Sequence, residues 1–232
     1  MTIARLLGEE ELAGYPAGRL LDVMRALTMI LTVPAAAAER ADAVAVMTGQ
    51  GETWRLAHAV ADWEAHPGRR HLLVATTNAA EATYAPITLD TLRGLGLRRT
   101  AGVHIQAEAA ADTGVQAAWI AGQIRERGIT GLALAVSPYH LPRAYLTVLR
   151  ACEERGVRVP LLPLPVAVAP SELVPETAAP AWDMLPGEIR RILDYTDRGW
   201  VAGPEQLRQY LDWLWPMLAN RPGVGVSPAE AG

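Results

Sequence analysis

The chain has 232 residues, half of them hydrophobic, and its formal net charge is −4. This length is enough for one domain with a sizeable core. The weakly acidic balance argues against a nucleic-acid partner, because such proteins normally carry a clustered basic face. A single cysteine excludes a disulfide within the chain, and no pair of histidines has metal-ligand spacing, so no metal site is predicted.

The first residues lack the pattern of a signal peptide, and the longest apolar stretch, residues 27–38, is interrupted by threonines and a proline. A helix that spans a bilayer needs about 20 apolar residues. We therefore expect a cytoplasmic protein without a membrane partner, either a monomer or a homodimer.

The predicted core, residues 41–166, alternates strands with helices. Short continuous apolar runs are typical of strands whose sheet is covered on both faces, and five strands are expected at 43–47, 71–75, 103–105, 131–136 and 157–162. Apolar residues at helical spacing predict helices between them. This alternation indicates a parallel sheet with right-handed crossovers. We predict an α/β, Rossmann-like three-layer fold with a central, mainly parallel sheet.

Segments on either side of the core complete the chain. Residues 1–40 are predicted to be an N-terminal helical extension. Residues 167–219 are expected to form a connection and C-terminal helices packed on the core, and the Pro-rich stretch 160–186 is expected to run as an extended surface segment. Residues 220–232 are rich in Pro and Gly, and we expect a disordered tail there.

Ligands of open parallel sheets bind beyond the carboxyl ends of the strands, where four of the predicted loops meet. These loops carry glycines, hydroxyl and amide side chains, and two arginines. We predict that they bind a small anionic ligand. The candidate binding residues are Gly49, Gln50, Gly51, Arg55, Thr76, Thr77, Asn78, Asp112, Thr113, Gln116, Ser137, Tyr139 and Arg143.

The first of these loops is the turn Gly49-Gln50-Gly51. A helix begins just after it, so free backbone N–H groups point into the loop, as in phosphate-binding turns. The third glycine of the dinucleotide motif is missing, and an ordinary turn is an equal alternative. Arg55 falls in the first turn of the helix, where a cation opposes the helix dipole. A salt bridge to Glu52 or a bound anion would offset that cost.

The last loop, Ser137-Pro138-Tyr139-His140, follows a buried strand. Pro142 is predicted in the first helical turn, where proline is tolerated, and Arg143 lies beside it. Two helices then point their N-termini, each with an arginine, at one edge of the sheet. This arrangement predicts an anion between them.

His140 is the acid–base candidate. The ordinary pKa of histidine is about 6.5, and nearby arginines and a helix N-terminus would favour the neutral imidazole, which can act as a base. Glu108 follows a strand directly and is predicted to be its catalytic partner or to bind a hydroxyl group. Structural alternatives remain open: His140 as a helix cap, Glu108 as a solvated charge and Asp112 as an N-cap.

The order of these motifs resembles the YdcF/SanA/ElyC-like family of bacterial domains over residues 41–166. The matching pieces are Gly49-Gln50-Gly51 with Arg55, Glu108, Asp112-Thr113 with Gln116, and Ser137-Pro138-Tyr139-His140-Leu141-Pro142-Arg143-Ala144. The chain departs from the family at Thr76-Thr77-Asn78, where Ser-Gly-Gly is usual, and at Asp112 and Gln116, where asparagines are usual. Without a membrane anchor it looks like the soluble YdcF-like branch. The resemblance implies S-adenosylmethionine as a candidate ligand and assigns no reaction.

Three functions remain open on the sequence. The first is an enzyme, a transferase or hydrolase, that acts on a phosphorylated or nucleotide-like anion. The second is a non-catalytic module that binds a nucleotide or S-adenosylmethionine. The third is a partner-binding protein that uses the tryptophans of the C-terminal region, unless these pack the helices onto the sheet; they are Trp182, Trp200, Trp213 and Trp215.

Overall fold

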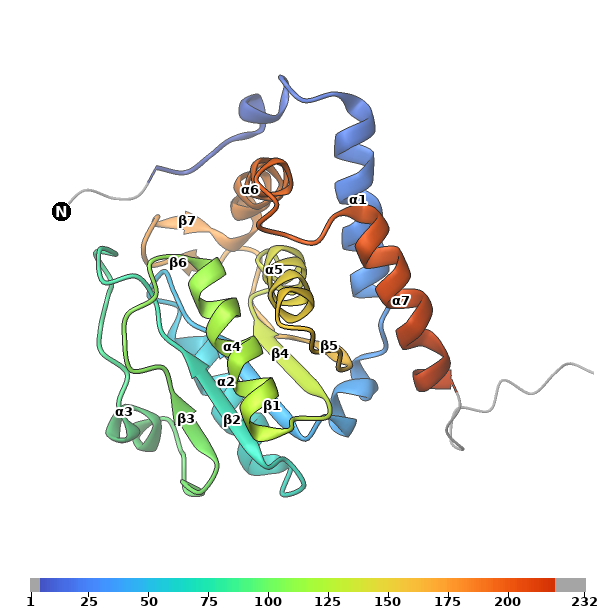
Figure 1. The fold of residues 1–232 in the computed structure, drawn as a ribbon. Helices are drawn as coiled ribbons and strands as arrows, with labels where there is room; N and C mark the ends of the chain where they lie inside the picture. Colours follow the sequence, from blue (N-terminus) through green and yellow to red (C-terminus); the bar gives the residue numbers. More distant parts are fainter. Residues whose placement is uncertain (1–4, 220–232) are drawn as a thin grey trace, which may run out of the picture.

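A five-stranded parallel sheet forms the centre of the protein in the computed structural model, which describes residues 5–219 (Figure 1). The strands are β1 (Ala43–Met47), β2 (His71–Ala75), β3 (Val103–Ile105), β4 (Leu132–Val136) and β5 (Leu161–Pro165). Their order across the sheet is β3-β2-β1-β4-β5. In register, Val44 of β1 lies between Leu72 of β2 and Ala133 of β4. The predicted α/β, Rossmann-like fold is confirmed.

Helices cover both faces of this sheet. The helices of the described residues are α1 (Ala17–Leu31), α2 (Thr53–Ala65), α3 (Leu89–Gly94), α4 (Thr113–Arg127), α5 (Leu141–Glu154), α6 (Leu185–Asp197) and α7 (Pro204–Ala219). Helix α2 packs on β1, β2 and β4 with α3 beside it, and α4 and α5 pack on the other face. Every residue of β1 and β4 is therefore buried, which explains their continuous apolar sequences.

The chain outside the sheet forms a further layer around α5. Helices α1 and α6 pack on α5, and α7 packs on α1 (Figure 1). Short 3₁₀ helices, η1 (Glu9–Leu12), η2 (Ala35–Arg40) and η3 (Ala181–Met184), lie in the connections. In the part of the chain that the structure describes, no helix is long and apolar enough to cross a lipid bilayer.

The end of the core differs from the prediction. Strand β5 starts at Leu161 rather than at residue 157 and includes Pro163 and Pro165. Proline is tolerated there because β5 is an edge strand, so one side of its backbone needs no partner in the sheet. The expected extended segment at 160–186 is also wrong in part, because it contains β5, η3 and a small hairpin.

This hairpin is formed by β6 (Leu173–Val174) and β7 (Ala179–Pro180), and it packs beside the loop that follows β1. The Glu176 N–H donates to the Gln50 carbonyl at 3.2 Å, and the Glu176 carboxylate accepts from the Thr83 N–H at 2.9 Å. Gly51 has φ +72°, and a Cβ there would lie 2.9 Å from Pro175. Only glycine lets the hairpin approach so closely.

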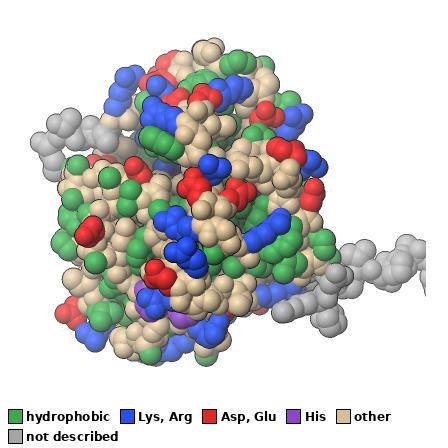
Figure 2. All heavy atoms as spheres, in the orientation of Figure 1, with side chains coloured by type: hydrophobic (Ala, Val, Ile, Leu, Met, Phe, Trp, Pro, Cys, Tyr) green, Lys and Arg blue, Asp and Glu red, His purple; other side chains and the backbone are tan. Residues whose placement is uncertain are grey.

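The four tryptophans of the C-terminal region divide into two pairs. Trp213 and Trp215 pack against the core, whereas Trp182 and Trp200 remain 75% and 49% exposed. Acidic and basic side chains are interspersed over the molecular face in Figure 2. The tail predicted to be disordered, residues 220–232, lies outside the described residues.

Candidate functional site

The loops after β1 and β4 diverge at one point of the sheet. From β1 the chain proceeds to β2 and β3 on one side, then crosses to β4 and β5 on the other. A crevice opens at such a switch point, beyond the carboxyl ends of the strands. A cavity of about 250 Å³ lies there. Its lining residues are Thr48, Gly49, Gln50, Arg55, Thr77, Asn78, Glu81, Ala110, Ala111, Asp112, Thr113, Gln116, His140, Arg143, Arg191 and Tyr195.

Most of the predicted site residues therefore meet around one cavity. Those outside its lining are Gly51, Thr76, Glu108, Ser137 and Tyr139. The side chain of Glu108 is exposed, and its backbone carbonyl accepts a hydrogen bond from Thr76 Oγ1 at 2.7 Å. Tyr139 is buried in a small apolar cluster with Val174 and Met184. Neither Glu108 nor Tyr139 is placed to contact a ligand in the cavity.

Arg55 is 2% exposed and forms an ion pair with Glu52, so the structural alternative for this arginine is realised. Its Nε also donates to Ser137 Oγ at 3.0 Å, and Trp54 Nε1 donates to the same oxygen at 3.0 Å. The Ser137 hydroxyl in turn donates to the Glu52 carboxylate. This buried cluster joins α2 to the end of β4, and it leaves Ser137 unavailable as a nucleophile.

The turn after β1 is held by a carboxylate of the protein itself. The Gln50 N–H donates to Glu81 Oε2 at 2.7 Å, and Thr77 Oγ1 donates to Glu81 Oε1 at 2.6 Å. The turn thus binds an internal anion where a phosphate was expected. The side-chain oxygen of Gln50 is buried and has no hydrogen-bond partner among residues 5–219. Because Gln50 lines the cavity, a ligand hydroxyl or N–H could satisfy that oxygen.

Two polar side chains that were predicted to bind a ligand stabilise the fold. Gln116 Nε2 donates to the carbonyls of Thr48 and Thr76 at 2.8 Å each, so its amide joins the ends of β1 and β2. Asp112 Oδ1 accepts from the Val115 N–H at 2.9 Å and caps α4. Asp112 remains exposed at the cavity wall, so capping leaves part of its carboxylate accessible.

Glu188 is the central residue that the sequence did not reveal. It lies in the first turn of α6, is 1% exposed, and approaches the cavity from outside the predicted core. Its Oε2 is 2.5 Å from Arg143 Nε and 3.1 Å from His140 Nδ1. Its Oε1 accepts from Arg191 Nη1 at 3.0 Å. Glu188, rather than Glu108, is the carboxylate beside His140.

The hydrogen bonds of Glu188 define the tautomer of His140. A carboxylate oxygen 3.1 Å from a ring nitrogen requires a proton between them, because two lone pairs repel. Arg143 Nη2 also lies 3.1 Å from Nδ1, but it has an acceptor in Glu188 Oε1 at 3.1 Å. We therefore assign the proton to Nδ1. Nε2 then carries a free lone pair on a ring that lines the cavity.

The charge state of this pair follows from burial and from Arg143. Burial, followed by the Arg143 charge, lowers the pKa of His140 to about 3. Burial alone would raise the pKa of Glu188, but Arg143 and His140 outweigh it and hold that pKa well below its usual range. At neutral pH the site thus combines a neutral imidazole with an ionised carboxylate. Arg143 also donates to Thr113 Oγ1 at 2.6 Å.

One face of α6 completes the cavity. Glu188, Arg191 and Tyr195 are spaced i, i+3 and i+7, so their side chains lie on the same side of the helix. The apolar residues Ile192 and Leu193 anchor the neighbouring stripe in the core. The only sequence signal was this polar stripe beside an apolar one, and it is common on surface helices.

The arrangement supplies a base, a buried carboxylate that orients it, and arginine donors. Among the described residues, no group of three or more His, Cys, Asp and Glu side chains is placed to hold a metal ion. Comparison of the chain with protein-family models, curated proteins and solved structures finds no match.

Proposed function

We propose that the protein is an enzyme, a transferase or hydrolase, that acts on a phosphorylated or nucleotide-like small anion. The observation that carries this proposal is the His140–Glu188 pair in a cavity at the switch point of the sheet. A carboxylate that holds Nδ1–H directs the Nε2 lone pair of a histidine toward a substrate, the arrangement used in general acid–base catalysis.

In this mechanism Nε2 of His140 takes a proton from an attacking water or acceptor hydroxyl and returns it to the leaving group. Arg191 is the principal anion-binding residue, because its side chain is 32% exposed and lines the cavity. Arg143 is buried and positions Glu188 and His140. Arg143 and Arg191 carry two positive charges against one on Glu188, so the end of the cavity beside His140 favours an anion, whereas Glu81 and Asp112 line other parts of the wall.

The low pKa of His140 in the free protein has a consequence for substrate binding. A pKa of about 3 makes a weak base, and the nearby Arg143 contributes to that value. A bound anion would oppose the field of Arg143 and raise the pKa of the imidazole. The charge of the substrate would therefore activate the group that reacts with it.

The motif resemblance described above supports the same location. It joins the turn after β1 to the segment Ser137–Arg143, and both border the crevice. We accordingly propose a divergent, soluble YdcF-like protein. Glu188 lies outside the stretch that carries the resemblance, so its role rests on the geometry alone.

A kinetic experiment tests the proposal. The purified protein is incubated with phosphomonoesters, phosphodiesters and nucleoside di- and triphosphates, and products are identified by mass spectrometry. For any substrate that turns over, His140→Gln should lower kcat by about 100-fold or more, which is typical of a lost general base. His66→Gln is the matched control, because His66 follows the far end of α2. Unchanged turnover in His140→Gln would remove the assignment.

A binding module is the second candidate, and the low pKa of His140 favours it if no ligand raises that value. Nucleotides or S-adenosylmethionine would then bind without reaction. Calorimetry combined with product analysis separates the two functions: micromolar binding of such a ligand without any product supports the module.

A further inference from the structure

A second cleft adjoins the cavity. It has a volume of about 310 Å³ and lies along α4, α5 and the turn between α6 and α7. Asp112 and Tyr195 belong to the walls of both spaces, so the two lie side by side. The walls of the two spaces differ: the cavity holds His140 and Arg191, whereas the cleft has an apolar part that includes Val115 and Trp200. Thr147, Arg150 and Glu154 also line the cleft.

Trp200 gives this cleft a preformed aromatic wall. Its ring centroid lies 5.2 Å from that of Tyr195 at an interplanar angle of 60°, and Arg198 Cζ lies 4.9 Å from the Trp200 ring. Within the described part of the chain, the lining of the cleft includes Trp200 but not Arg198. The ring is thus held by two neighbours while half of its surface stays exposed. Planar bases stack on exposed aromatic rings of this kind.

Asp112 stands at the junction of the two spaces with one oxygen available. Its Oδ1 accepts from the Val115 N–H, and no hydrogen bond reaches Oδ2 among residues 5–219. An ionised carboxylate accepts hydrogen bonds from vicinal hydroxyl groups, such as those of a ribose. From the cavity to the cleft, the side chains are therefore a cation, a hydrogen-bond acceptor for hydroxyl groups and an aromatic ring.

We propose that the ligand of this site is a nucleoside phosphate whose base lies in the second cleft. Arg191 binds the phosphate beside His140, Asp112 accepts from a ribose hydroxyl, and Trp200 and Tyr195 form the wall for the base. This inference rests on the proposed function and adds the part of the molecule that distinguishes a nucleotide from any other phosphate ester.

The test compares ligands with and without a base. Calorimetry measures the binding of the four ribonucleoside 5′-monophosphates, ribose 5-phosphate and inorganic phosphate to the whole chain. We expect at least one nucleotide to bind more tightly than ribose 5-phosphate by about 5- to 150-fold, the range of base–aromatic stacking. Trp200→Ala should remove that difference and leave the affinity for ribose 5-phosphate unchanged. Trp182→Ala, which alters another exposed tryptophan outside both spaces, should keep it.

The outcomes separate this inference from the proposed function. Equal affinity for the nucleotides and ribose 5-phosphate, or a nucleotide preference that survives Trp200→Ala, would overturn the base-binding cleft and leave the anion site standing. If none of the nucleotides, ribose 5-phosphate or phosphate binds, both proposals fail. Reduced nucleotide binding in Trp182→Ala as well would also count against a specific role for Trp200.

Discussion

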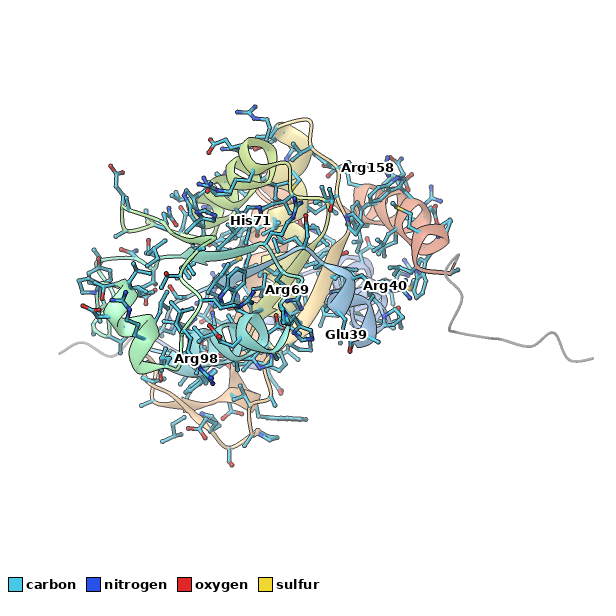
Figure 3. The ribbon with its side chains drawn as sticks, turned by 90° about the horizontal axis from the view of Figure 1, so that it is seen from below. Glu39, Arg40, Arg69, His71, Arg98 and Arg158 are labelled. Atoms are coloured by element: carbon cyan, nitrogen blue, oxygen red, sulfur yellow. The ribbon has the colours of Figure 1, made fainter. Side chains whose placement is uncertain are left out.

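Two buried arginine–carboxylate pairs lie at opposite edges of the sheet. At the amino edge, Arg69 lies beside the start of β2 and is labelled in Figure 3. It pairs with Asp62 and donates to the carbonyls of Ala38 and Ala41 at 3.0 Å each. At the carboxyl edge, Arg143 pairs with Glu188. Both arginines are less than a tenth exposed. Burial of an ion pair is thus common to the two regions and does not by itself indicate a functional site.

The neighbours of each pair make the difference. Arg69 Nη1 donates to two backbone carbonyls and Nη2 donates to Asp62 Oδ1, so the pair joins η2 and α2 to the segment before β2 and has a structural role. A histidine adjoins each pair, because His66 Nδ1 lies 3.2 Å from Asp62 Oδ1. The imidazole beside Arg143 and Glu188 is that of His140, which borders a cavity together with the partly exposed Arg191. The Arg69–Asp62 pair stabilises the fold, whereas the Arg143–Glu188 pair lies beside groups that a ligand can reach.

The largest effect on stability is expected when the amino-edge pair is broken. Arg69→Met should lower the free energy of unfolding by about 3–5 kcal/mol, because Asp62 would stay buried without a counter-charge. Urea denaturation followed by circular dichroism measures the loss. Any folded fraction should bind anions as the wild type does. A loss below about 1 kcal/mol would contradict the structural role of this pair.

At the carboxyl edge, Glu188→Gln should lower the free energy of unfolding by about 1.5–3 kcal/mol, the typical contribution of hydrogen bonds to charged groups. The loss is smaller because water in the cavity can hydrate Arg143. The variant also leaves Arg143 and Arg191 without a carboxylate, so phosphate should raise its Tm more than that of the wild type. The melts compare phosphate with chloride at equal ionic strength. Equal phosphate effects on both proteins would contradict an anion site, and Arg69→Met supplies the control for the other edge.

A pH series isolates His140. Its pKa is about 6.5 when unfolded and about 3 in the fold, so only the unfolded chain gains a proton as the pH falls below 6.5. Stability should therefore decrease with falling pH, by at most about 1.4 kcal/mol per unit from this group. Between pH 6.5 and 5, the urea midpoint of His140→Gln should decrease less with falling pH than that of the wild type. Parallel curves for the two proteins would contradict the neutral, buried imidazole.

The smallest effect on stability is expected for Arg191→Ala. The Arg191 side chain is 32% exposed, and a partly solvated ion pair contributes less than about 1 kcal/mol. Anion affinity, measured by calorimetry, should nevertheless fall about tenfold or more, since a charged hydrogen bond to the ligand is lost. An affinity equal to that of the wild type would contradict the assignment of Arg191 to the anion site. Arg93→Ala, on α3 and outside the lining of both spaces, is the control for the removal of an arginine.

The strands of the core could be predicted from the sequence because a buried strand has a continuous run of apolar residues. All five residues of β1 and of β4 are apolar, as are the four residues of β2 that follow His71. Strand β5 was displaced because Pro163 and Pro165 suggest a loop, and only its place at the sheet edge makes them acceptable. That place is a property of the assembled sheet.

The candidate site was predictable where it follows strands and not where it comes from the C-terminal helices. His140 and Arg143 could be located because the exit of a buried strand indicates their position. Glu188 could not, since an acidic residue in the first turn of a helix is ordinarily explained by the helix dipole. Glu108 has the right position in the chain, but its loop turns the side chain to solvent. Orientation of that kind depends on tertiary packing.

The distance along the chain between His140 and Glu188 has a consequence for biosynthesis. The two residues are 48 positions apart, with β5 and the β6–β7 hairpin between them. A ribosome therefore synthesises the residues of all five strands before it adds the carboxylate of the site. Premature termination before α6 would yield a chain with all five strands and a histidine that lacks its orienting partner. The residues of the sheet are thus synthesised before the residue that completes the site.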